Sequence, residues 1–308
     1  MVKVLCLGEI LLDRINDCAY PGGAPANVAI ALAKLGTRVG FIGCVGQDQI
    51  GQELLSKLNQ AGVDTTGVQI YPQASTREVF VESDQAGNPQ FVRFVGDADA
   101  YLAAELLPSH IFADADFLVL GTLMLASPIS SRALARALKL AEQYFLKVVV
   151  DLNWREIFWQ NPAEAPRLIQ IMLSHVDFLK LSASEAELFF RTTSPAAIAQ
   201  SLPELEGVIV TDGAAECRYY FGNRQGKMPS FEVKTLDTVG AGDAFLAGFV
   251  HQICQRSLNC LDQPQTVAEI IRYAQAVAAI STQAVGASAS LPTDAEVKAF
   301  LQSQSAQA

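Results

Sequence analysis

The segment LDTVGAGDAFLAGF, residues 236–249, places Gly240 and Gly242 before a carboxylate, Asp243, where an apolar helical pattern begins. The free N–H groups at a helix N-terminus favour an anion such as phosphate, and glycines let that anion approach the backbone. A carboxylate repels phosphate, so Asp243 could instead take a proton from an attacking hydroxyl, as in phosphoryl transfer. The alternative is that Asp243 is an ordinary favourable charge at a helix start.

A second cluster lies near the N-terminus. Gly22 and Gly23 precede a helix expected from Ala26, with Asn27 in its first turn and Asp13 expected at the end of the first strand. Asp and Asn offer acceptors and donors that suit sugar hydroxyls, and paired glycines let a ring lie against the backbone. A Gly-Gly turn before a helix is common, so this cluster alone is a weak indication.

Polar residues also follow several short apolar runs that indicate strands. Open α/β sheets bind their ligands at the carboxyl ends of such strands. Glu185 could lie near the metal of a nucleotide, or it could be a charge at a helix start. These candidates, in chain order, are Asp151, Asn153, Arg155, Ser182, Glu185, Thr211 and Gly213.

The elements that would position these residues alternate between short Val/Ile/Leu-rich strands and longer helical patterns. This alternation predicts an α/β fold with a doubly wound, mostly parallel sheet flanked by helices. Residues 76–94 break the rhythm and predict an antiparallel hairpin around the turn-rich DQAGN. That hairpin is either an ornament at a sheet edge or a lid over the site. No repeat or long linker interrupts the 308 residues, which favours a single domain.

Composition excludes several classes of protein. The net charge of −10 argues against a nucleic-acid binder, although backbone amides could still bind phosphate. The six cysteines form no CxxC pair, which suggests buried thiols in a reducing compartment. The N-terminal run reads as a core strand, and no apolar stretch approaches the roughly 20 residues of a membrane span, so a cytoplasmic protein is expected. A dehydrogenase is disfavoured because no GxGxxG opens the first helix, and no P-loop is present.

Taken together, the motifs resemble those of the PfkB (ribokinase-like) family of sugar kinases. DTVGAGD resembles its C-terminal signature, and PGGAPANVAIALAKLG followed by FIGCVGQDQIG resembles its N-terminal signature. The resemblance covers about residues 4–292, and GGAPANVA, DLNWR and FLKLS are most similar to fructokinases. It implies a ribokinase-like domain over residues 1–308, with a small β lid formed by about 14–21 and 76–97.

The resemblance also implies roles for individual residues. Asp243 would be the catalytic base, with an anion hole formed by Gly240, Ala241 and Gly242. The implied sugar contacts are Asp13, Gly22, Gly23, Asn27, Arg93, Asn153 and Arg155. The implied ATP contacts are Ser182, Glu185, Thr211, Gly213, Gln275, Gly286 and Ala287. Glu185 would act on Mg²⁺ through water. A monovalent cation such as K⁺, which many members bind, would lie near Asp237, Val239, Gly286 and Ser290.

Two departures from the family pattern stand out. Only eight residues, 14–21, separate Asp13 from Gly22, where fructokinases usually have a longer lid segment. A shorter lid would shield the site less, suppress ATP hydrolysis less well and weaken dimerisation through the lid. Gln275 stands where the family often has Asn.

The implied function is an ATP-dependent sugar kinase, with D-fructose as the favoured acceptor and fructose 6-phosphate as the product. Ribose, 2-keto-3-deoxygluconate, tagatose phosphate or a nucleoside remain alternative acceptors. A non-catalytic sugar or nucleotide sensor on the same fold is an alternative of another class. The expected partners are the sugar, ATP and a second copy paired through the lid, with no nucleic acid and no membrane.

Overall fold

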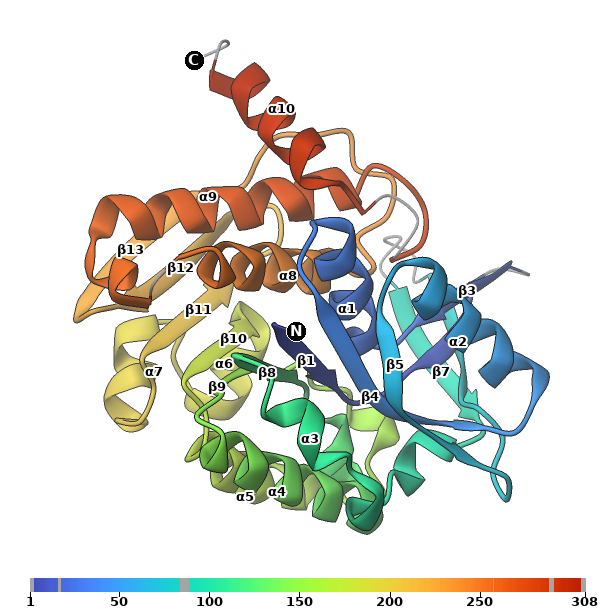
Figure 1. The fold of residues 1–308 in the computed structure, drawn as a ribbon. Coiled ribbons are helices and arrows are strands. Elements are labelled where there is room, and N and C mark those ends of the chain that lie inside the picture. Colours follow the sequence, from blue (N-terminus) through green and yellow to red (C-terminus); the bar gives the residue numbers. More distant parts are fainter. Residues whose placement is uncertain (1–2, 16–17, 84–88, 257, 288–290, 306–308) are drawn as a thin grey trace.

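The computed structural model describes residues 3–305 apart from 16–17, 84–88, 257 and 288–290. Within those residues, nine strands form the main sheet (Figure 1). In spatial order they are β13 (Arg224–Pro229), β12 (Glu216–Phe221), β11 (Gly207–Thr211), β10 (Phe178–Ser182), β9 (Lys147–Asp151), β8 (Phe117–Leu120), β1 (Val4–Leu7), β4 (Val39–Gly46) and β5 (Asp64–Tyr71). Neighbours from β11 to β5 are parallel, which confirms the predicted sheet type, whereas β11–β12–β13 is an antiparallel extension that the sequence patterns missed.

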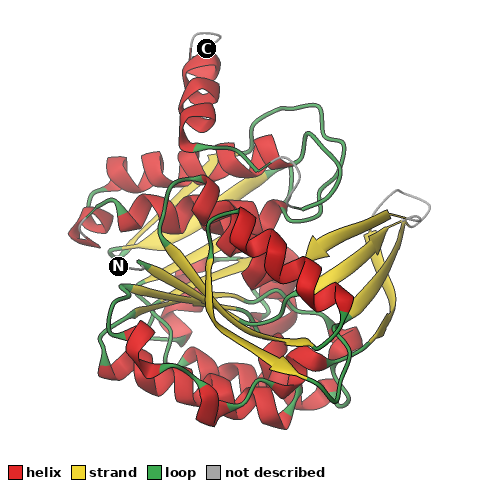
Figure 2. Ribbon diagram, turned by 45° about the vertical axis from the view of Figure 1, so that its right-hand side comes forward, coloured by secondary structure: helices red, strands yellow, loops and turns green. Residues whose placement is uncertain are grey.

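Helices cover both faces of this sheet, as Figure 2 shows. One layer contains α1 (Ala24–Lys34), α2 (Gln49–Gln60), α8 (Ala241–Cys254), α9 (Pro264–Ser281) and α10 (Asp294–Ser305). The other contains α3 (Ser109–Phe112), α4 (Pro128–Gln143), α5 (Ala165–Leu173), α6 (Ala183–Phe190) and α7 (Pro195–Ser201). Strand β1 shows why its run is continuously apolar: Val4 and Cys6 face the first layer, whereas Leu5 and Leu7 face the second.

A second sheet of four strands in the described residues projects from one end of the molecule. Its order is β3 (Cys18–Gly22), β2 (Leu11–Ile15), β6 (Glu78–Ser83) and β7 (Pro89–Val95). The antiparallel pairing of β6 with β7 is the hairpin expected over residues 76–94. The position of Asp13 was wrong: it lies in β2 of this second sheet, because β1 ends at Leu7 and the chain turns at Gly8.

Helix α1 begins at Ala24, two residues before the predicted start. Gly23, with a φ of 98°, is its N-cap, and Pro25 fits the first turn because that position needs no N–H donor. The helix ends where the sequence indicated, with Gly36 in a left-handed conformation at φ 90°. Helix α1 packs against α8, so the first turns of both helices approach each other.

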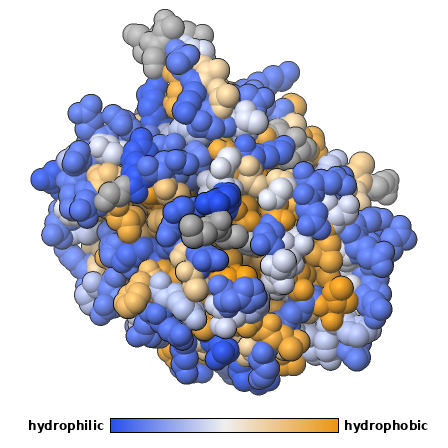
Figure 3. Space-filling view, viewed as in Figure 1, coloured by the Kyte–Doolittle hydropathy of each residue, from blue (hydrophilic) through white to orange (hydrophobic). Residues whose placement is uncertain are grey.

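Hydrophilic side chains cover much of the face shown in Figure 3, with apolar ones interspersed. Across the described residues, no helix combines the length and the apolar character that crossing a bilayer requires. All six cysteines are unpaired.

Candidate active site

A cavity of about 450 Å³ opens between the carboxyl edge of the main sheet and the second sheet. Leu11, Asp13 and Val79 line it from the second sheet. The ends of β8, β9, β10 and β11 contribute polar groups, as expected for a parallel sheet, and the N-terminus of α8 closes another side. The polar residues of its wall include Glu9, Asp13, Asn27, Thr122, Asp151, Asn153, Arg155, Lys180, Ser182, Glu185, Thr211, Asp243 and Gln275.

Helix α8 presents an uncapped N-terminus to this cavity. Its N-cap, Gly240, has a left-handed conformation at φ 78°, and no side chain of the described residues caps the helix. A Cβ at Gly240 would collide with Ala287, so this turn requires glycine. The N–H of Ala241 already donates to the carbonyl oxygen of Thr238 at 3.2 Å, which removes Ala241 from the implied anion hole of Gly240, Ala241 and Gly242. The amides of Gly242 and Asp243, in the first turn, are left for a ligand, and the helix dipole favours an anion there.

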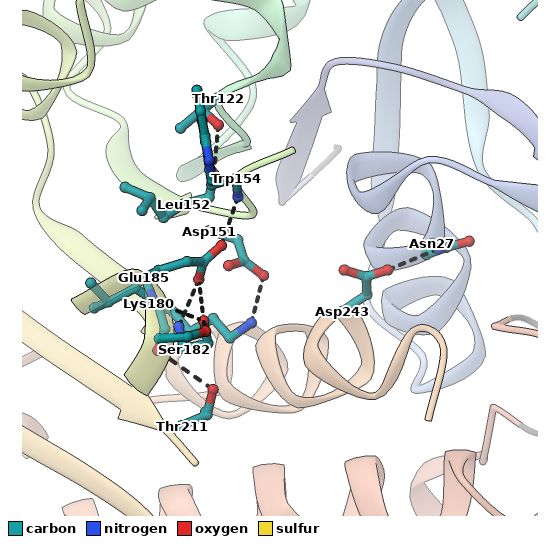
Figure 4. Close-up of polar contacts among 12 residues, drawn as sticks. Asn27, Thr122, Asp151, Leu152, Trp154, Lys180, Ser182, Glu185, Thr211 and Asp243 are labelled. Carbon is teal, nitrogen blue, oxygen red and sulfur yellow. Dashed lines mark hydrogen bonds and ion pairs between the residues drawn. The ribbon is translucent and has the colours of Figure 1, made fainter. Parts of the chain in front are cut away.

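Asp243 is held at the cavity wall by Asn27 of α1. The Asn27 Nδ2 group donates a hydrogen bond of 2.8 Å to Asp243 Oδ2 (Figure 4). Burial, followed by the nearby Asp151 carboxylate, raises the pKa of Asp243 to about 6, while the Asn27 hydrogen bond opposes that rise. A carboxylate with a pKa of this size is well suited to accept a proton near neutral pH.

The sugar-side candidates Asp13, Gly22 and Gly23 lie together. Asp13 is 7% exposed, and burial together with the charge of Asp243 raises its pKa to about 7. A side chain at Gly22 would overlap the Asp13 carboxylate, and a Cβ at Gly23 would lie 2.5 Å from the carbonyl oxygen of Glu9. Gly22 is thus required by close packing against the Asp13 side chain, and Gly23 by close packing against the backbone of Glu9 and Ile10.

Three buried side-chain oxygens lack a hydrogen-bond partner within the described residues: Glu9 Oε2, Asn27 Oδ1 and Asp151 Oδ1. All three residues line this one cavity. Buried polar atoms are rarely left unsatisfied in folded proteins, so these oxygens indicate a ligand rich in hydrogen-bond donors. A sugar with several hydroxyl groups has that character.

The nucleotide-side candidates gather around the ends of β10 and β11. Ser182 caps α6, and its N–H and hydroxyl donate to Glu185 Oε2 at 2.7 and 2.8 Å. The other oxygen, Glu185 Oε1, accepts the N–H of Trp154 at 2.6 Å and so fixes the loop that carries Asn153 and Arg155. Thr211, Gly213 and Gln275 also line the cavity.

Comparisons with known proteins place this geometry in a family. Residues 14–294 match the model of the pfkB family carbohydrate kinases. The chain belongs to the pfkB carbohydrate kinase family. Among relatives, "Probable fructokinase-2" of Arabidopsis thaliana is 34% identical over 317 residues, which cover 98% of this chain and 96% of the relative. Fructokinase-1 of Zea mays is also 34% identical, and the match covers 96% of each chain.

Solved structures of similar proteins share the whole fold. A fructokinase with bound ATP from Xylella fastidiosa superimposes with a TM-score of 0.92 at 29% identity, covering 98% of this chain and 99% of that one. A fructokinase double mutant from Vibrio cholerae O395, in a form with fructose, ADP and potassium ion bound, has a TM-score of 0.87 at 28% identity, and the match covers 98% of each chain. The ribokinase-like fold implied by the sequence motifs is thereby confirmed.

Some residues implied by the pfkB resemblance lie outside the cavity wall. Arg93 is paired with Phe80 across the β6–β7 hairpin, and its guanidinium stacks on that ring. Because strand residues alternate, this places Arg93 on the face of the hairpin opposite Val79, which lines the cavity. The structure therefore separates Arg93 from the other sugar-side candidates. Gly22 supports Asp13 from behind without lining the cavity.

The implied cation-binding positions lie beside the N-terminus of α8. Asp237 accepts the N–H of Val239 at 2.9 Å and that of Gly286 at 2.8 Å, and so ties two loops together. Gly286 packs against Tyr20 of β3, and Ala287 against Gly240, so both support the site from outside the cavity. Ser290 lies outside the described residues. In the part of the chain that the structure describes, no three acidic, His or Cys side chains cluster in a metal-binding arrangement.

Two lining residues of this pfkB site, Glu9 and Lys180, escaped the sequence reasoning. Glu9 follows β1; its Oε1 accepts the N–H of Ala24 at 3.1 Å, and burial raises its pKa to about 8. Lys180 interrupts the apolar run FLKLS and pairs with Asp151, whose Oδ2 lies 2.7 Å from Nζ. A charged residue within an otherwise apolar strand was the available signal for Lys180.

Proposed function

We propose that this chain transfers the γ-phosphoryl group of ATP to the 6-hydroxyl of D-fructose, giving fructose 6-phosphate and ADP. The single observation that carries this proposal is the placement of Asp243 at the uncapped N-terminus of α8, inside a cavity with unsatisfied sugar-side oxygens. The fructokinase relatives along nearly the whole chain support fructose over the alternative acceptors. They also support an enzyme over a non-catalytic sensor.

In the proposed reaction, Asp243 accepts the proton of the 6-hydroxyl as O6 attacks the γ-phosphorus in line. The amides of Gly242 and Asp243 hold the negative charge of the phosphoryl group, with Gly240 and Ala241 shaping the turn. Asp13, Asn27, Gly23, Asn153 and Arg155 orient the sugar. The carboxylates that surround the acceptor are partly protonated near neutral pH, which lets them both donate and accept hydrogen bonds.

The nucleotide would lie against Ser182, Thr211, Gly213 and Gln275, with Gly286 and Ala287 behind. Mg²⁺ typically reaches kinases with the phosphates and keeps several waters, which fits a cavity where no three of the described carboxylates cluster around one point. Both oxygens of Glu185 already hold the backbone, so we propose that it influences Mg²⁺ only through water. Asp237, Val239, Gly286 and Ser290 remain the proposed K⁺ site.

We propose one domain over residues 1–308, with the four-stranded sheet as its lid. The segment 14–21 is short, so pairing of two copies through this sheet and sealing of the site should both be weaker than in fructokinases with a longer segment. A cytoplasmic location fits the unpaired cysteines and the requirement for ATP.

The deciding experiment is a coupled assay of ADP release over a panel of acceptors: fructose, ribose, 2-keto-3-deoxygluconate, tagatose 6-phosphate and adenosine. Fructose should give the highest kcat/KM. Asp243→Asn should lower kcat by about 10²–10⁴-fold or more while fructose and ATP still bind. Binding of fructose without ADP release in the unmodified protein would point to the sensor instead.

A further inference from the structure

Lys180 and Asp151 form a buried ion pair that the proposed reaction has not yet used. They are direct register partners on the parallel strands β10 and β9, with Nζ 2.7 Å from Oδ2. Lys180 is 6% exposed and Asp151 is 4% exposed. Strand alternation places both on the face covered by α8, since Phe178 and Val149 lie on that face, whereas Leu179 and Val150 lie on the other.

The ammonium of Lys180 lies against the first turn of α8. A Cβ added to Gly242 would be 2.8 Å from Nζ. The N-terminus of a helix carries partial positive charge, so a cation at that place is opposite to what the helix dipole favours. The Lys180 ammonium and the N-terminus of α8 therefore place two positive charges at one part of the cavity wall. An anion bound between them would offset their mutual repulsion.

The hydrogen bonds of Lys180 also indicate an anion at this place. An ammonium has three donors, and in the described residues Lys180 Nζ makes one hydrogen bond, to Asp151 (Figure 4). Both residues line the cavity, and the other carboxylate oxygen, Asp151 Oδ1, is buried without a hydrogen-bond partner among the described residues. A pair that served only to stabilise the fold would be expected to be fully satisfied, and two apolar residues would serve that purpose as well.

We propose that Lys180 is a catalytic residue whose ammonium contacts the phosphoryl group during transfer, and that Asp151 is the residue that positions it. This inference rests on the proposed function. As Asp243 takes the proton, O6 bonds to the γ-phosphorus, and the bond from phosphorus to the bridging oxygen breaks with its electron pair left on ADP. Lys180 transfers no proton; its charge offsets the negative charge on the phosphoryl oxygens.

This role explains Gly242 as well. A glycine at this place leaves room for the Lys180 ammonium at the helix terminus, in addition to baring the backbone for the phosphate. The cavity wall holds five carboxylates, of Glu9, Asp13, Asp151, Glu185 and Asp243, and its described cations are Lys180 and Arg155. Lys180 is the one of these two that lies at the anion hole by a measured contact.

The test separates a phosphoryl contact from simple neutralisation of Asp151. Lys180→Gln removes the cation, and the double variant Lys180→Gln/Asp151→Asn leaves a neutral pair of similar shape. The exposed Lys139 on α4, changed to Gln, is the matched control. For each protein we would measure kcat and KM for fructose and ATP, the affinity for fructose by calorimetry, and thermal unfolding.

Both Lys180→Gln and the double variant should lose about 10²–10³-fold in kcat, as for removal of one group that stabilises an oxyanion, while fructose affinity changes little. Recovery of kcat to within about threefold of the unmodified protein in the folded double variant would overturn the inference. If the double variant fails to fold, the folded Lys180→Gln variant decides alone, and a kcat within about threefold of that of the unmodified protein would overturn the inference. Failure of the unmodified protein to phosphorylate fructose would instead overturn the proposed function.

Discussion

Asn27 of α1 donates its Nδ2 hydrogen bond to Asp243 of α8, across 216 residues of sequence. The bond joins the two glycine-led helix starts that carry the sugar-side and phosphate-side motifs. The bond occupies one carboxylate oxygen of Asp243, Oδ2, and stabilises the ionised form of the carboxyl group. The other side of the Asn27 amide, Oδ1, is buried, has no hydrogen-bond partner in the part of the chain that the structure describes, and can accept a hydrogen bond from a sugar hydroxyl.

We therefore predict that Asn27→Ala moves the acid limb of the pH–rate profile upward. The base works in its ionised form, so kcat/KM should fall as the pH drops through about 6, the pKa of Asp243. Loss of the hydrogen bond raises that pKa, and activity should then fall at a higher pH. The profile of kcat/KM for fructose from pH 5 to 9 measures the shift, with Asn59→Ala on the exposed face of α2 as control. An acid limb that stays in place or moves to lower pH in Asn27→Ala would contradict the assignment of Asp243 as the base.

Glu9 should make the protein less stable as the pH rises. Its pKa is raised from 4.5 to about 8 by burial, so the folded state favours the protonated carboxyl. This contribution to stability is complete below pH 4.5, and it should decrease by roughly 1.4 kcal/mol per pH unit as the pH rises towards 8.

Glu9→Gln, which is always neutral and can still accept the N–H of Ala24, should remove that slope. Urea unfolding of both proteins from pH 5 to 8.5 gives the difference, and Glu142→Gln on the exposed face of α4 is the control. Equal slopes for the unmodified protein and Glu9→Gln would show that Glu9 is ionised in the folded protein.

Gly23 and Gly36 provide a matched pair of glycine substitutions. Both have a positive φ, 98° and 90°, but a Cβ at Gly23 would meet the Glu9 carbonyl oxygen at 2.5 Å, whereas Gly36 has open space. Gly36→Ala should lower the free energy of unfolding by about 1–2 kcal/mol, from backbone strain alone, and leave kcat unchanged. Gly23→Ala should cost more and raise the KM for fructose at least about tenfold, because the loop beneath the sugar must move. Equal stability and equal KM in the two variants would contradict the close packing at Gly23.

The sequence predicted the parallel sheet and the glycine-led helix starts because hydrophobic runs and glycine positions are local signals. The β6–β7 hairpin was equally readable from its turn. Lys180 was missed because its role depends on register with Asp151, and register is set by the whole sheet rather than by the strand itself. Arg93 was placed with the sugar residues by resemblance, but only its pairing with Phe80 shows which face of the hairpin it occupies.

The ion pair of Arg77 and Asp99 should hold the second sheet onto the body of the protein. Arg77 Nε lies 2.8 Å from Asp99 Oδ1, and both side chains are 6% exposed. The guanidinium also lies over the rings of Phe94 of β7 and of Phe158, which lines the cavity. Arg77→Met leaves the Asp99 charge buried without its cation, which should lower the free energy of unfolding by about 3–5 kcal/mol. Lys3→Met breaks the exposed pair with Asp116 and should lower it by about 1 kcal/mol or less.

If the second sheet is the lid, the Arg77 variant should also change how ATP is used. Loosening the sheet exposes the phosphoryl group to water, so ADP release without fructose should rise relative to the rate with fructose. The ratio of these two rates, measured for Arg77→Met and Lys3→Met at a temperature where both are folded, isolates the effect. A loss of stability with an unchanged ratio would show that the pair stabilises the fold without controlling closure. A raised ratio in Arg77→Met alone would identify the sheet as the element that excludes water.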